Sequence, residues 1–217
     1  MGVRDASRRR TEEAILAAAR SEIAAVGGVG LSMRKVAREV GLVSSAVYRY
    51  FPTREALLTA LIVESYLHLA AALDGDESSS GPADHGAFWV GRARALRQWA
   101  RRHPHEFQLL YGTPVPGYVA PVETIPAAEA VARRFIDAAA PGVVAGFDDP
   151  ALLRQMVALG GPEQAALIAA VIAELSALVG FVGLELAGHF VGTADPADLL
   201  FEALVERQLQ TLGLRRR

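Results

Sequence analysis

The sequence predicts an all-α protein in which a three-helix N-terminal domain precedes a larger helical domain. Apolar residues recur three and four positions apart along most of the chain, and we find neither an alternating strand pattern nor an internal repeat. At 217 residues the chain is long enough for two cores. The net charge is only −2, but the charges are unevenly distributed along the chain, because residues 1–54 carry ten basic and five acidic side chains. Any surface that meets a polyanion is therefore predicted in the N-terminal part.

Three short helices are predicted before residue 54. Their ranges are 11–26, 32–41 and 44–50. Thr11, Ser32 and Ser44 can each cap the start of one of these helices, and Gly41 suits the left-handed position that ends the second. Phe51-Pro52-Thr53 interrupts the chain after the third helix, so the first domain is predicted to span residues 1–53.

A long helix over residues 54–73 is predicted to connect this domain with the second one, residues 54–217. Residues 74–84 are rich in Ser, Gly, Asp and Pro, which predicts a loop. The remaining helices are predicted at about 85–103, 104–112, 125–140, 150–160, 163–192 and 196–213.

Several functional classes are disfavoured by what the sequence lacks. There is no cysteine, which excludes a disulfide framework and a thiolate metal site. The first ten residues are polar and rich in arginine, without the apolar stretch of a secretory signal, so we expect a cytoplasmic protein. We find no serine nucleophile elbow, phosphate-binding glycine loop or paired-carboxylate motif, and we therefore expect neither an enzyme nor a bound cofactor.

Basic residues occur where a helix dipole disfavours them. Arg34 and Lys35 belong to the first turn of the second helix, and Arg54 to the first turn of the long one. Each cation there should cost about 0.3–1 kcal/mol unless an anion lies nearby. A phosphate group would supply that anion. The alternative is that these residues are solvated surface cations.

The third helix has one apolar side and one polar side. Val47 and Phe51 are spaced to face a core. The residues left for the opposite side are Ser44, Ser45, Tyr48 and Arg49. Arg49 could make a bidentate contact with guanine, and the hydroxyls of Tyr48 and Tyr50 could bind phosphates. Alternatively, one of the two tyrosines is a half-buried packing residue, and such helical corners also occur in proteins that do not bind DNA.

These segments together resemble the DNA-binding domain of the TetR (tetracycline-repressor) family over residues 11 to about 62. They read LSMRKVA at 31–37, GLVS at 41–44 and AVYRYFPTREALL at 46–58. The resemblance implies that bases are contacted by Ser44, Ser45, Ala46 and Arg49. It also implies that phosphates are contacted by Ser32, Arg34, Tyr48, Tyr50 and Arg54. Arg54 stands where lysine is commoner in the family, a change that keeps the positive charge.

The C-terminal part is similar to one type of TetR C-terminal domain, from Phe88-Trp89 through Arg102-His103-Pro104 to Tyr111-Gly112. In that family this domain pairs two subunits and binds an effector. The resemblance implies a homodimeric DNA-binding transcriptional regulator, usually a repressor, that a small molecule releases from its operator. The alternative is a small-molecule-binding or membrane-associated helical protein without specific DNA binding, and binding to duplex DNA at low salt would separate the two.

An effector pocket and a subunit interface are predicted in this domain. The pocket candidates for an apolar small molecule are Trp89, Phe107, Tyr111, Tyr118, Phe135 and Met156. The helix at 163–192 is apolar enough to suggest a membrane span, but Glu174 and Glu185 share one of its faces and argue against this. Its other face carries small residues, which with two leucines of the last helix predict a dimer interface. The interface candidates are Ala169, Ala173, Ala177, Gly180, Leu184, Gly188, Leu200 and Leu204.

A metal site is considered at His103, His105 and Glu106. The two histidines flank Pro104, and the sequence offers no identifiable third and fourth ligand. The pattern is more typical of the boundary between two helices, so no metal is expected.

Overall fold

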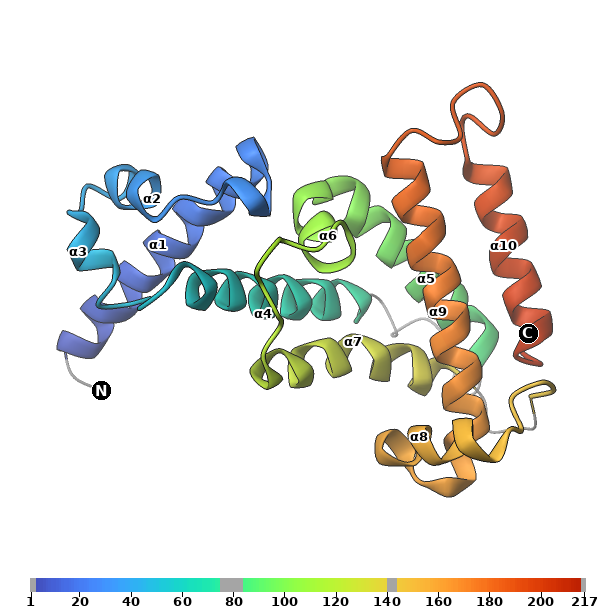
Figure 1. Cartoon of the computed structure of the whole chain (residues 1–217). Coiled ribbons are helices and arrows are strands. Elements are labelled where there is room, and N and C mark those ends of the chain that lie inside the picture. Colours follow the sequence, from blue (N-terminus) through green and yellow to red (C-terminus); the bar gives the residue numbers. More distant parts are fainter. Residues whose placement is uncertain (1–2, 75–83, 140–143, 216–217) are drawn as a thin grey trace. The chain divides into compact units, whose positions relative to one another are not determined.

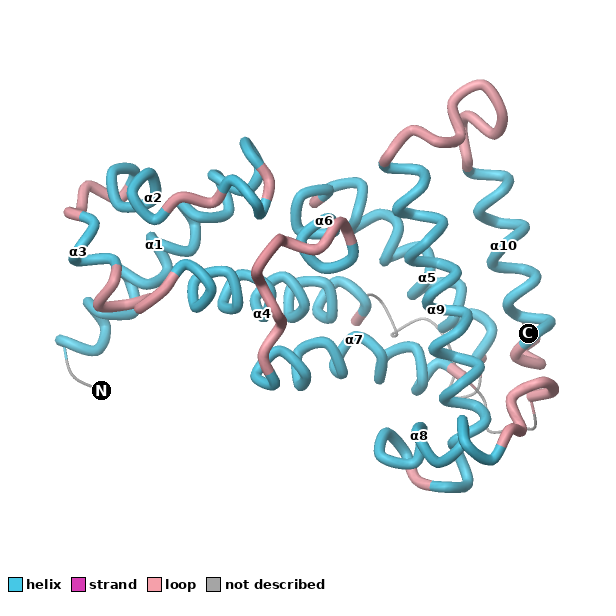
Figure 2. Tube along the Cα trace, viewed as in Figure 1, coloured by secondary structure: helices cyan, strands magenta, loops and turns pink. Residues whose placement is uncertain are grey.

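The computed structural model describes residues 3–74, 84–139 and 144–215. Every regular element in these ranges is helical, which confirms the all-α prediction (Figures 1 and 2). In the first half of the chain the elements are α1 (Val3–Val26), the 3₁₀ helix η1 (Gly28–Gly30), α2 (Met33–Glu39), α3 (Ser44–Val47), α4 (Arg54–Leu73), α5 (His85–Arg102) and α6 (Pro104–Tyr111). In the second half they are η3 (Val122–Thr124), α7 (Ile125–Ala138), α8 (Pro150–Gly160), η4 (Pro162–Gln164), α9 (Ala165–Leu186) and α10 (Asp198–Thr211).

Contacts divide the chain into two compact units. Unit 1 comprises Met1–Tyr66 and His105–Ala127, and unit 2 comprises Leu67–Pro104 and Ala128–Arg217. The sequence placed a functional boundary at residue 53, whereas the contacts place the first part of α4 and the segment 105–127 with the N-terminal helices. Most of the predicted loop at 74–84 lies outside the described residues.

Unit 1 has a core to which α1, α2, α3 and α4 all contribute. Its fully buried members include Ile15, Ala19, Val36, Val47, Leu57 and Leu61. Local signals shape these helices as the sequence predicts. The Ser32 hydroxyl accepts a hydrogen bond from the backbone N–H of Lys35 and so caps α2, and Gly41 takes the left-handed conformation with φ of 68°.

Two predicted helix caps are wrong. The first helix begins at Val3, and the hydroxyl of Thr11 donates to the Ser7 carbonyl inside α1 instead of capping it. An ion pair between Arg8 and Glu12, one turn apart, supports this N-terminal extension. In α3 the capping position is occupied by Val43, and the Ser44 side chain makes no cap. This helix has only four residues, and the chain continues through turns to Tyr50.

A segment distant in sequence completes unit 1. Side chains from α6 and the loop after it, including Leu109, Val115 and Tyr118, pack on the core of the N-terminal helices. The hydroxyls of Thr59 and Tyr118 are hydrogen-bonded at 3.0 Å. A Cβ atom at Gly28 would lie 3.0 Å from Val115, so glycine permits this close approach.

Unit 2 is built on the packing of α5 against α9 and α10, with α8 against α9. In its core the indole of Trp89 donates to the side-chain oxygen of Gln208 at 3.1 Å, and the Gln208 amide donates to the Glu174 carbonyl at 2.7 Å. Each polar group is thereby paired where an unpaired one would be costly. The predicted helix at 163–192 ends earlier, at Leu186, because Gly188 adopts the left-handed conformation.

Among the described residues, two helical stretches are long and apolar enough by composition to cross a membrane, Arg54–Leu73 and Pro162–Leu186. About half of each apolar window is buried inside the folded chain. Within the second stretch the Glu174 side chain is buried and forms an ion pair with Arg207 at 3.3 Å. These contacts are those of a core helix, in which a carboxylate can find partners that hydrocarbon cannot supply.

Candidate nucleic-acid interface

The start of α2 presents cations beside a capped helix end. Arg34 and Lys35 are exposed, whereas Met33 and Val36 are buried in the core. The Lys35 ammonium lies 3.0 Å from a carboxylate oxygen of Glu22 on α1. This pair reduces the unfavourable interaction of Lys35 with the helix dipole. Lys35 is half exposed whereas the Glu22 side chain is only 14% exposed, so the ammonium can also reach an anion outside the unit.

The α3 segment exposes most of its predicted DNA face. Ser45, Tyr48 and Arg49 are exposed, with 46% of the Tyr48 surface accessible, and Ser44 is half-buried. Val47 is fully buried, as its spacing predicts. Ala46 is only 7% exposed and belongs to the buried side, so the base contact implied for it by the family resemblance is corrected.

Tyr50 combines packing with a polar environment. The ring is half-buried against the core of unit 1, as the alternative from the sequence allowed. The Arg8 guanidinium lies over this ring, 5.2 Å from its centroid. Sequence reasoning did not select Arg8 as an interface residue. The available signal was the Arg8-Arg9-Arg10 run, which the structure places on the exposed surface of α1.

Arg54 has a role that differs from the expected phosphate contact. Its Nε donates to the Leu31 carbonyl at 3.0 Å. Its Nη2 donates to the carbonyls of Gly28 and Val29 at 2.7 and 2.9 Å. The side chain is 27% exposed. The guanidinium therefore satisfies carbonyls around η1, and the α4 start is capped by Thr53, whose hydroxyl accepts from Ala56 N–H.

Other exposed arginines of unit 1 can meet a polyanion. They include Arg8, Arg9, Arg10, Arg34, Arg38 and Arg49. Guanidinium groups form bidentate hydrogen bonds with phosphate and with the major-groove edge of guanine. The arrangement can therefore bind a nucleic-acid backbone and, through Arg49 and Ser45, approach base edges.

The six predicted pocket residues belong to different units. Trp89, Phe135 and Met156 lie in unit 2, whereas Phe107, Tyr111 and Tyr118 lie in unit 1. Trp89 and Phe135 are fully buried, with ring centroids 5.4 Å apart, and Met156 is half-buried on α8. In unit 1, Phe107 is buried against Tyr111 with ring centroids 5.4 Å apart. Burial, with a smaller contribution from the Tyr66 hydroxyl, raises the pKa of Tyr111.

A cavity of about 590 Å³ in unit 2 has different chemistry from the predicted apolar pocket. Its lining residues are Arg94, Arg97, Gln98, Arg101, Arg102, Phe201 and Glu202. Two of its arginines are engaged in ion pairs, Arg94 with Glu202 at 2.7 Å and Arg97 with Glu185 at 2.6 Å. None of the six predicted pocket residues lines this cavity.

The predicted interface residues of unit 2 are mostly exposed. On α9, Ala173, Gly180 and Leu184 are exposed and Ala177 is half-buried, and Gly188 follows the helix end. On α10, Leu200 is 43% exposed and Leu204 is half-buried, while the neighbouring Leu199 is 86% exposed. Ala169 is buried within the unit, so its predicted place on this surface is corrected. The exposed residues form an apolar stripe shared by α9 and α10.

Comparison with known proteins agrees with this arrangement. A family model described as "Bacterial regulatory proteins, tetR family" matches residues 15–61. A second, described as "Tetracyclin repressor-like, C-terminal domain", matches residues 89–208. The HTH-type transcriptional regulator Rv1816 of Mycobacterium tuberculosis is 40% identical over 147 residues, which cover 67% of this chain and 63% of that regulator. The match thus spans less than two thirds of the length of this curated relative.

Solved structures share the fold. The crystal structure of the regulatory protein SCO4313 aligns with a TM-score of 0.81 and 34% identity over 96% of this chain and 100% of that one. A protein of unknown function from Rhodococcus sp. RHA1 aligns with a TM-score of 0.67 and 26% identity, over 93% and 94% of the two chains. The C-terminal family model alone covers more than half of the sequence. The chain belongs to the TetR family of helix-turn-helix transcriptional regulators.

Proposed function

We propose that this TetR-family regulator is a cytoplasmic, sequence-specific repressor and not an enzyme, and that a small molecule releases it from its operator. The observation that carries the DNA-binding part is the exposed surface of α3 and of the turn after it, where Ser45, Tyr48 and Arg49 are exposed while Val47 is buried. This face has hydroxyl groups for close approach and a guanidinium for a guanine edge. The exposed arginines of α1 and α2 supply contacts that hold the domain on the phosphate backbone.

The test is binding of the purified full chain to duplex DNA at several salt concentrations. A regulator should select related fragments from a random pool, and its log Kd should rise steeply with log salt concentration. A membrane-associated or purely ligand-binding helical protein would show neither property. Failure to bind any duplex at 50 mM salt would contradict the proposal.

A homodimer is part of this proposal, since one small domain contacts too few base pairs to select a site. The apolar stripe on α9 and α10 supports it. Leu184, Leu199 and Leu200 are large apolar residues exposed in the single chain. A second copy of the same two helices would cover them in a four-helix arrangement about a two-fold axis.

For the effector, we propose a largely apolar small molecule held by the C-terminal domain of each subunit. Support comes from the buried aromatic pair of Trp89 and Phe135, which adjoins the polar side chain of Gln208. Apolar pockets with a few polar groups are the usual sites for such ligands. The pair is packed, so entry of a ligand must displace side chains.

Release follows if the effector favours a dimer whose two α3 segments are no longer one helical turn of DNA, about 34–36 Å, apart. Its affinity must then fall in the operator complex by the same factor by which it weakens operator binding. Calorimetry of a releasing compound with free and operator-bound protein measures both factors. Equal affinity for the two forms would exclude this mechanism.

A further inference from the structure

The cavity of about 590 Å³ in unit 2 has one strongly basic wall, formed by α5. This wall carries Arg94, Arg97, Arg101 and Arg102, and the opposite side is formed by the first two turns of α10. Residues three, four, seven and eight positions apart share one face of a helix. Four guanidinium groups therefore project from the same side of α5, within one compact unit.

This positive charge is concentrated in an otherwise acidic part of the chain. Residues 55–217 carry twelve basic and nineteen acidic side chains, and four of the twelve basic ones line this cavity. The helix dipole favours Arg101 and Arg102 in the last turn of α5. It gives no such support to Arg94 and Arg97, because its effect is confined to the ends of a helix. The dipole alone does not account for the cluster.

Two of the four arginines are held in place by carboxylates. Arg97 is 8% exposed and donates to both oxygens of Glu185, at 2.8 and 2.6 Å, and to Asp198 at 2.8 Å. Its guanidinium lies over the ring of Phe201, 4.7 Å from the centroid. Arg94 donates to both oxygens of Glu202, at 2.9 and 2.7 Å. Bidentate pairs fix the orientation of a side chain, so Arg94 and Arg97 form fixed parts of the cavity wall.

The other two arginines have no such partner. Arg101 and Arg102 are exposed, and their guanidinium groups make neither a hydrogen bond nor an ion pair with any residue that the structure describes. A guanidinium has five N–H donors and binds the oxygens of phosphate or carboxylate in pairs. Two unpaired guanidinium groups beside a cavity are therefore suited to an anion with several oxygens.

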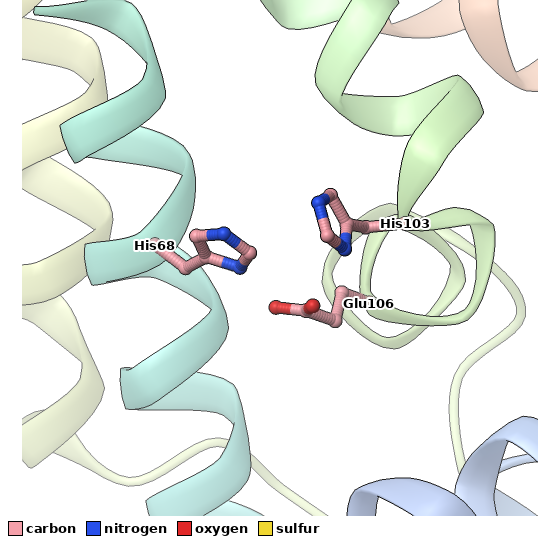
Figure 3. A group of neighbouring side chains, drawn as sticks. All are labelled: His68, His103 and Glu106. Carbon is pink, nitrogen blue, oxygen red and sulfur yellow. The ribbon is translucent and has the colours of Figure 1, made fainter.

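Unit 2 also contains a pair of imidazoles, His68 and His103, whose ring centroids are 4.5 Å apart (Figure 3). Glu106, which Figure 3 also labels, belongs to unit 1. Zinc sites in proteins have at least three protein ligands, and the described residues of unit 2 supply no third one beside this pair. A ligand of unit 2 is therefore better accommodated by the arginine-lined cavity.

We propose that this cavity binds a small anionic molecule that carries a phosphate group or several carboxylates, with Arg101 and Arg102 as its main contacts. The volume lies within the range of about 300–1,000 Å³ that is usual for small-molecule sites. Phe201 adds an apolar surface beside Arg97. The site is separate from the packed aromatic pair of Trp89 and Phe135, and it depends neither on the apolar effector nor on DNA binding.

The experiment is calorimetric titration of sodium pyrophosphate, and separately of sodium citrate, into the full-length chain. The buffer contains no phosphate and about 20 mM NaCl, so that exposed charges are weakly screened. We expect one anion to bind in unit 2 of each chain with a Kd below about 1 mM. Tighter binding of pyrophosphate identifies a phosphate-bearing ligand, and tighter binding of citrate identifies a polycarboxylate. Since the basic surface of unit 1 can bind the same probes, variants of unit 2 locate the site.

Replacing Arg101 and Arg102 together by glutamine should weaken this binding by at least about tenfold, because two charged donors are lost. The matched control is Arg154→Gln, which removes an exposed cation of α8 outside the cavity and should keep the affinity within about twofold of wild type.

Glu202→Gln should have the opposite effect. It removes the carboxylate that competes for Arg94, so the affinity should rise by about threefold or more. Glu163→Gln, which removes an exposed negative charge on η4, controls for the change in net charge. A gain in affinity cannot result from misfolding, and circular dichroism checks the fold of the double arginine variant. No saturable binding of either probe below about 5 mM would overturn the proposal. So would wild-type affinity in the double arginine variant, or a gain in Glu202→Gln no larger than that in Glu163→Gln.

Discussion

Replacing Arg54 by alanine removes a guanidinium that donates three hydrogen bonds to the carbonyls of Gly28, Val29 and Leu31. A hydrogen bond from a charged donor contributes about 1.5–3 kcal/mol when well shielded. The Arg54 side chain is 27% exposed, and water can replace part of what is lost. We therefore take about 1 kcal/mol for each bond and expect a loss of roughly 2–3 kcal/mol in the free energy of unfolding.

For a chain of about this size, each kcal/mol lowers the melting temperature by about 2–4 °C. Arg54→Ala should thus melt roughly 5–10 °C below wild type in circular dichroism. Arg54→Lys should recover little, because a single ammonium cannot replace a guanidinium that reaches three carbonyls. The matched control is Arg34→Ala, which removes an exposed cation and should leave the melting temperature within about 1 °C of wild type.

Salt-dependent DNA binding separates this role from the phosphate contact that the sequence suggested. A lost phosphate contact in each subunit lowers the slope of log K against log salt by about two for a dimer, and lysine restores it. We expect Arg34→Ala to show that change and Arg54→Ala to keep the wild-type slope below its melting temperature. A wild-type melting temperature for Arg54→Ala, together with a reduced slope that Arg54→Lys restores, would refute the structural role.

Three further predictions follow from the interface, the apolar stripe and unit 2. Arg49→Ala should relax base preference at particular positions of DNA fragments selected from a random pool, and an unchanged selected motif would exclude Arg49 from base contact. Gly180→Trp should give a monomer in light scattering, because a Cβ atom at Gly180 points into open space and the added ring would occupy the surface proposed for the second subunit. A wild-type monomer at micromolar concentration would contradict the dimer. A hydrogen bond from Arg134 lowers the pKa of Asp74 in the folded protein. The Asp74–Arg134 pair therefore stabilises the fold above the pKa that Asp74 has in the unfolded chain, and this stabilisation is lost as the pH falls through the lowered, folded-state pKa. Asp74→Asn should therefore flatten the decline in urea stability as the pH falls below the ordinary pKa of aspartate, about 3.9, by a small amount since Asp74 is half-exposed. An undiminished decline would contradict this assignment.

The parts of the fold that sequence predicted well are those with local signals. The bounds of α4, Arg54 to Leu73, agree with the prediction. The Ser32 cap and the left-handed Gly41 were also correct, because a cap or a positive φ depends on residues within one turn of the chain. Between the residues that start or end a helix, the strong helical periodicity of the apolar residues favours helix over any other secondary structure.

The errors have local physical causes too. Thr11 was taken as a cap, but the polar residues before it form helix when pairs such as Arg8 and Glu12 support each other one turn apart. The end of α9 was placed at 192 because apolar residues continue to Val191. Gly188 stops the helix instead, and glycine inside an apolar run is an ambiguous signal.

Roles that depend on distant partners could not be found by spacing. Arg54 bonds to carbonyls 23 to 26 positions earlier, and His68 meets His103 across 35 positions. Only the packing of helices brings such groups together. The same holds for Ala46, whose place on the buried side of α3 depends on how that helix packs against α2.

The charge of the N-terminal part therefore overstates the number of cations available to DNA. Arg54 is held by backbone carbonyls, and its transfer to a phosphate would leave those carbonyls without their donor. Arg20 forms an exposed ion pair with Glu64, and such a weak pair can exchange a carboxylate for a phosphate at little cost. Lys35 is half exposed but pairs with the largely buried Glu22, so its exchange costs more. The salt dependence of binding should then be set by the exposed arginines together with Lys35, and the positive charge of Arg54 should contribute to the long-range field without contributing a contact.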